Sequence, residues 1–139
     1  MHLNRNHSPK KMNDFSSRFK NLSNAFFLIP VVVALYFRGY VFGSIVFIST
    51  ITSFLYHLSR ERSYLRIDSF FAYAMMLMNL VIFVIVGFGN LFIWSGVFLV
   101  LISLFLHFTE EDNYNFNHAL WHLTSSLATS LFIIAFYSR

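Results

Sequence analysis

Long apolar segments alternate with short polar ones along most of the chain. One of them, residues 67–86, is twenty residues long, enough for a hydrocarbon core of about 30 Å at 1.5 Å per helical residue. The pattern predicts an all-α, multi-pass transmembrane helical bundle of about five spans. The predicted spans are roughly 22–37, 40–58, 67–86, 91–108 and 116–137.

Short polar or glycine-containing breaks separate these spans. Arg38-Gly39 and residues 87–90 predict tight turns, 59–66 predicts a polar loop, and 110–113 predicts an acidic one. Residues 1–24 are basic with no repeating apolar face, so we expect a cytoplasmic tail there and the bundle over 25–139. A signal peptide is the alternative for the first segment. The tail is long for such a peptide's basic region, and no small-residue cleavage site precedes Arg38.

The basic residues are distributed unevenly between the two sides of this bundle. After two spans the chain returns to the side on which it started, so the tail and the 59–66 loop lie together. The tail holds five and the loop three of the ten Lys and Arg residues, whereas the other side holds only Arg38 and Arg139. Because basic loops stay in the cytoplasm, we expect the N-terminus to be cytoplasmic and the C-terminus to lie across the membrane.

Composition agrees with a membrane protein and excludes other classes. The 139 residues, enough for one domain, are 57% hydrophobic and 12% charged, against roughly 25% charged residues in soluble domains. The net charge of +4 does not indicate nucleic-acid binding, because the basic residues border apolar segments and form no continuous patch. The absence of cysteine excludes disulfides and thiolate metal sites.

The polar residues of several spans are predicted to meet on the cytoplasmic side. The second and fourth spans end there, and the third and fifth begin there. Ser53 lies one helical turn before His57, and the pair four residues apart at the start of the last span shares one helix face. The residues that converge at this level are His57, Asp68, His107, His118 and His122.

These side chains can provide the groups of a hydrolytic metal site. His57, His118 and His122 would supply three neutral nitrogen ligands, and three protein ligands plus a water make up the usual catalytic zinc site. Zinc lowers the pKa of such a water to about 7. Asp68 would accept the water's proton and later deliver it to a leaving group, while Ser53 would orient the water or stabilise the oxyanion. The hypothesis is hydrolysis of a membrane-lipid amide or ester.

Each residue also has a purely structural interpretation. A lone His-x-x-x-His pattern is a weak signal for metal, and His57 would also suit an interfacial helix end. Asp68 would serve as an N-cap of the third span, and Ser53 would hydrogen-bond to its own helix. We interpret His107 as an interfacial residue or one that supports a metal ligand from behind. The combination on one leaflet favours a site.

The motif Ser53-x-x-x-His57, with Asp68 eleven residues later and His118-x-x-x-His122 at the start of the last span, resembles the CREST superfamily of membrane hydrolases. The interval from His57 to Asp68 is most similar to alkaline ceramidases. The stretch 118–122 is more similar to lipid hydrolases that remodel GPI anchors, and Tyr56-His57 to myomaker-like proteins. The resemblance covers about residues 45–130.

This resemblance implies zinc on His57, His118 and His122, with Ser53 and Asp68 at the bound water. The family typically has seven spans, whereas this chain has room for five. Losing two spans between Asp68 and His118 keeps all five residues on one leaflet. A closed substrate chamber is then not implied, so the pocket would open to lipid or be completed by a second copy in a homodimer.

Three further functions compete with a zinc-dependent lipid hydrolase. A membrane receptor or fusion-type protein would keep zinc as a structural link. A haem-binding electron carrier would use two histidines on separate helices, but both members of the pair on one helix face cannot ligate opposite sides of one haem. A channel fits least, because the polar positions are concentrated toward one leaflet.

Overall fold

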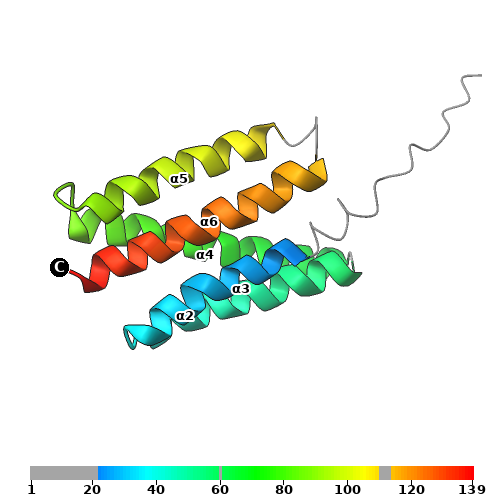
Figure 1. The fold of residues 1–139 in the computed structure, drawn as a ribbon. Coiled ribbons are helices and arrows are strands. Elements are labelled where there is room, and N and C mark those ends of the chain that lie inside the picture. Colours follow the sequence, from blue (N-terminus) through cyan, green and yellow to red (C-terminus); the bar gives the residue numbers. More distant parts are fainter. Residues whose placement is uncertain (1–21, 60, 110–113) are drawn as a thin grey trace, which may run out of the picture.

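The computed structural model describes residues 22–59, 61–109 and 114–139, which are almost entirely helical. No strand occurs in these ranges, so the predicted all-α helical bundle is confirmed. A short 3-10 helix, η1 (Asn24–Phe27), leads directly into α2 (Leu28–Tyr36), and four longer helices follow (Figure 1). These are α3 (Tyr40–Ser59), α4 (Arg62–Val86), α5 (Leu91–Phe108) and α6 (Tyr114–Tyr137).

Four of the helices, α3 to α6, are long and apolar enough to cross a membrane. The predicted fourth span, 91–108, coincides with α5, and the second and fifth differ from α3 and α6 by one or two residues. The first predicted span differs more. Within the described residues it consists of η1 and α2, a shorter apolar helix than the other four. The acidic loop 110–113 and residues 1–21 of the predicted tail lie outside the described residues.

The third span begins earlier than the apolar pattern predicts. Helix α4 starts at Arg62, after an extended Glu61, so the second half of the predicted 59–66 loop is helical instead. Arginine and leucine have high helix propensity, and the backbone needs no apolar side chain to continue an α-helix beyond the apolar segment. Apolar composition marks the part of a helix that suits lipid, and the helix itself extends past it.

The predicted turn at Arg38-Gly39 is confirmed, and two backbone hydrogen bonds define it. The Arg38 amide donates to Leu35 O at 2.9 Å, and the Gly39 amide donates to Ala34 O at 2.7 Å. This is the Schellman pattern, with Arg38 in the left-handed position at φ 58°. The absence of a side chain at the next position leaves room for a residue of another helix. A Cβ on Gly39 would lie 2.7 Å from the Tyr137 hydroxyl oxygen at the end of α6.

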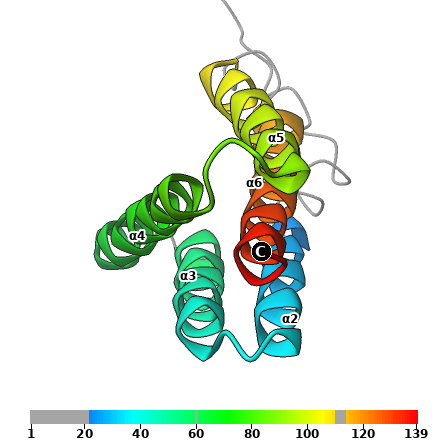
Figure 2. The same ribbon diagram turned by 90° about the vertical axis from the view of Figure 1, so that its left-hand side faces the viewer.

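Helix α6 is the central helix of the bundle. It packs along α5 and contacts α2, α4 and η1, whereas α3 contacts α2 and α4 on the other side (Figure 2). About half of the residues in its apolar segment are buried, a larger share than in α3, α4 or α5. Helix α4 projects to one side and packs mainly on α3. Large apolar side chains on the outer faces are exposed, as expected of helices that face lipid.

Polar side chains inside the bundle connect neighbouring helices. Asn79 on α4 donates from Nδ2 to Thr129 Oγ1 on α6 at 3.0 Å. The Ser103 hydroxyl on α5 lies 2.7 Å from Thr124 Oγ1 and 3.0 Å from Ser125 Oγ on α6. Hydrogen bonds and small residues of this kind hold membrane helices together, because lipid offers no alternative partner for a polar group.

The packing of Gly96 on α5 against α6 generates a stability prediction. A Cβ on Gly96 would lie 3.1 Å from the Phe132 ring, whereas a Cβ on Gly89, in the preceding turn, would meet nothing within 4 Å. Overpacking typically costs about 1–3 kcal/mol. We therefore expect Gly96→Leu to lower the midpoint of thermal unfolding in detergent by several degrees and Gly89→Leu to leave it nearly unchanged. Equal midpoints would contradict this packing.

Candidate metal centre

Three histidines from two helices lie together at one end of the bundle. His57 is in the last turn of α3, and His118 and His122 lie one turn apart near the start of α6. One ring nitrogen from each lies within 4.8 Å of the others. The predicted convergence of these three residues is confirmed. It follows from the antiparallel course of the helices, which places the end of α3 beside the start of α6 (Figure 1).

The spacing of two of these nitrogens matches that of ligands on one metal ion. His57 Nε2 and His118 Nε2 are 3.3 Å apart. Nitrogens bound tetrahedrally to zinc at about 2.0–2.1 Å are separated by roughly 3.3 Å. All three nitrogens lie within 4.8 Å of one another, so a metal ion could bind them after at most a small movement of the side chains. The three residues therefore fit a metal ion, and imidazole ligands suit zinc, copper, nickel and iron.

Two of the imidazoles are deeply buried. His122 is 2% exposed and His118 is 9% exposed, while His57 is half-buried. The Phe27 ring packs edge-on against His122, with ring centres 5.5 Å apart. Trp121 packs beside His118, with ring centres 5.4 Å apart. These aromatic neighbours restrict the orientation of the two imidazole rings and shield them from water.

Ser53, and Asp68 beside it, lie at the same end of the bundle as the histidines. Ser53 is buried one turn before His57, and its hydroxyl interacts with the Asp68 carboxyl group on α4. It also lies 3.1 Å from Asn24 Oδ1. Ser53 thus joins α3 to two other elements, unlike Thr50, whose hydroxyl donates to a carbonyl of its own helix. Asp68 is in the second turn of α4, so its interpretation as an N-cap is wrong.

His107 lies apart from the three-histidine group, at the exposed end of α5. Its ring packs against Trp121, with ring centres 5.7 Å apart, and Trp121 in turn packs against His118. The exposed position at the helix end agrees with the interpretation of His107 as an interfacial residue. The alternative, that His107 supports a metal ligand, stays a prediction.

The sequence pattern did not identify two buried residues of the centre. Ser23 and Asn24 are each 1% exposed, and Ser23 Oγ lies 2.8 Å from His122 Nδ1. In the sequence they look like the end of a polar tail. The signal that could have identified them is topological, because the start of the first span lies at the same level as the end of the second and the start of the fifth.

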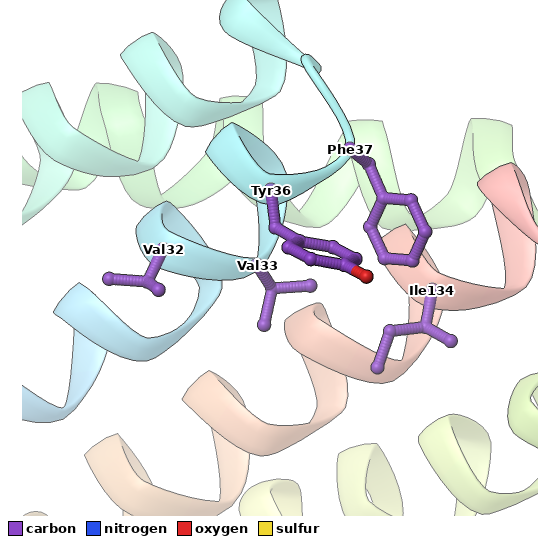
Figure 3. Close-up of a pocket in the computed structure, with 5 residues that line it drawn as sticks. All are labelled: Val32, Val33, Tyr36, Phe37 and Ile134. Carbon is purple, nitrogen blue, oxygen red and sulfur yellow. The ribbon is translucent and has the colours of Figure 1, made fainter.

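A surface hollow lies elsewhere, toward the opposite end of α2. It is apolar and open, and Val32, Val33, Tyr36, Phe37 and Ile134 line it (Figure 3). Tyr36 is thirteen residues beyond Ser23, roughly 20 Å along a helix. The hollow therefore takes no part in the histidine centre, and its apolar walls suit lipid chains.

Comparisons of this chain with known protein families, with curated proteins and with solved structures find no match.

Metal binding to this centre predicts a change in stability. A ligand that binds only the folded protein stabilises it by about 4 kcal/mol at a thousand times its dissociation constant. We expect zinc to raise the unfolding temperature of the detergent-purified, metal-free protein by several degrees, and His57→Ala to abolish the increase. Magnesium, which prefers oxygen ligands, is the control and should have no effect. An equal zinc response in the variant would contradict the site.

Proposed function

We propose that this protein is a zinc-dependent intramembrane hydrolase of a lipid amide or ester, similar to ceramidases. The observation that carries the proposal is the combination of a three-histidine cluster with Ser53 and the neighbouring carboxyl group of Asp68 at the same end of an apolar bundle. A structural metal site needs the histidines alone. The acid and the hydroxyl beside them are the groups that hydrolysis requires in addition. The resemblance to the CREST superfamily rests on the same five residues.

In this proposal the residues divide the work between metal binding and proton transfer. His57, His118 and His122 would hold the zinc ion, which when bound would acidify a water molecule and polarise a substrate carbonyl group. Asp68 would take a proton from the attacking water and return it to the leaving amine or alcohol. Ser53, anchored by Asn24, would keep the carboxyl group of Asp68 in one orientation through both steps.

The position of the centre supports a lipid as substrate. The histidines lie near helix ends, and the outer faces of the surrounding helices are apolar. An amide or ester carbonyl of a membrane lipid lies at a comparable level, just inside the headgroups. The distribution of basic residues would put this end of the bundle at the cytoplasmic leaflet.

A structural zinc site in a membrane receptor or fusion-type protein is the second candidate, and one observation favours it. Helices α3 and α6 make few direct contacts, because α2 and η1 pack between them on one side and α4 on the other. A metal ion on His57, His118 and His122 would connect α3 to α6 directly. In such a protein Asp68 would have no role in turnover.

Asp68→Asn distinguishes the two functions. General acid–base catalysis contributes about 10²- to 10⁴-fold to a rate, so we expect the variant to lose hydrolysis by that factor while it retains zinc. The assay would use detergent-purified protein with fluorescent ceramide and phospholipid substrates, and His57→Ala as the metal-free control. Turnover that Asp68→Asn leaves unchanged would overturn the proposed role of Asp68. Zinc-loaded wild type without turnover on any lipid would favour the structural site.

A further inference from the structure

The start of the first helix contacts the histidine centre through the Ser23 hydroxyl. Ser23 Oγ lies 2.8 Å from His122 Nδ1, a hydrogen-bond distance, although the two residues are 99 positions apart in the chain. Both side chains are almost fully buried. A hydrogen bond is electrostatically stronger in the interior of a protein than in water, so this contact favours one orientation of the imidazole ring.

This contact assigns different roles to the two nitrogens of His122. A histidine binds a metal through one ring nitrogen, and the hydrogen bond made by the other nitrogen decides which one. Since Nδ1 is directed at Ser23, Nε2 is the nitrogen that can face His57 and His118, whose Nε2 atoms also approach each other. A neutral ring with metal on Nε2 carries its proton on Nδ1. In that state His122 donates to Ser23 Oγ.

Ser23 is held in place from both sides of the bundle. The next residue, Asn24, pairs with Ser53 on α3. Two residues further on, the Phe26 carbonyl accepts a hydrogen bond from the Ser126 hydroxyl on α6. Phe27 then packs its ring against His122 itself. The segment 23–27 is thus fixed to both helices that carry the histidines, so the Ser23 hydroxyl has a defined position.

We propose that Ser23 is a positioning residue of the metal centre, which presents His122 Nε2 to the ion by holding Nδ1. The proposal rests on the metal site of the proposed function and extends that site to the first helix. Groups that hydrogen-bond the second nitrogen of a histidine ligand typically contribute about 10- to 100-fold to metal affinity. Through Ser23, the start of the first helix then contributes to metal binding.

The test compares zinc affinities of the full-length, detergent-purified protein after removal of metal, by competition with a chelating dye. Ser23→Ala should raise the zinc dissociation constant by about 10- to 100-fold, and Ser23→Thr, which restores a hydroxyl, should recover part of the loss. Ser126→Ala is the matched control. It removes an equally buried serine hydroxyl that anchors the same segment without touching a histidine, and it should change the affinity less than threefold.

A second readout separates positioning from general stability. Cobalt can replace zinc, and its visible spectrum reports the ligand geometry, so Ser23→Ala should alter this spectrum and Ser126→Ala should preserve it. Wild-type affinity and spectrum in Ser23→Ala would overturn the inference and leave the proposed function standing. Equal losses in the two alanine variants would also overturn it, because docking of the segment would then be the cause. A wild type that binds no zinc would overturn the proposed function and the inference together.

Discussion

Imidazole rings inside an apolar helical bundle, two of them deeply buried here, need partners, because burying a polar group without a hydrogen bond or a metal is costly. In this protein the end of α3 and the start of α6 bring His57, His118 and His122 to within 4.8 Å of one another. These two helices otherwise contact each other little. The histidine cluster is therefore a point at which α3 and α6 approach each other directly, and Ser23 beside His122 brings the start of the first helix to the same point.

Polar contacts are concentrated at the histidine end of the bundle and become fewer along its length. Beside the histidines, Ser23 hydrogen-bonds His122, Ser53 hydrogen-bonds Asn24, and the Asp68 carboxyl group lies next to Ser53. Further along the bundle the polar contacts become isolated pairs such as Asn79 with Thr129. At the far end a turn and an aromatic contact close the structure, where Gly39 lets Tyr137 approach. This gradient suits chemistry at one leaflet and anchoring in the other.

Much of this arrangement could be predicted from the sequence, because it depends on periodicity and on the alternating direction of successive helices. Segment 91–108, the turn at Arg38-Gly39 and the meeting of His57 with the pair on α6 all follow from those rules. The start of α4 could not be predicted from apolarity, because Arg62 and its neighbours continue the helix while facing water.

The contribution of the first helix to the site also could not be predicted from the sequence. Ser23 and Asn24 are short polar residues next to a basic tail, and nothing in their spacing relates them to partners 99 and 29 positions away. Helix direction places them at the correct end of the bundle. Only packing decides that Ser23 faces His122 and Asn24 faces Ser53.

The most direct test of the account is the metal content of the purified protein. Mass spectrometry on detergent-purified wild type and on His118→Ala should find about one zinc ion per chain in the wild type and none in the variant. X-ray absorption at the zinc edge should then show nitrogen ligands at about 2.0–2.1 Å. A folded wild type that contains no zinc, even after zinc is added back, would contradict the account, and the histidines would be packing residues of a membrane bundle.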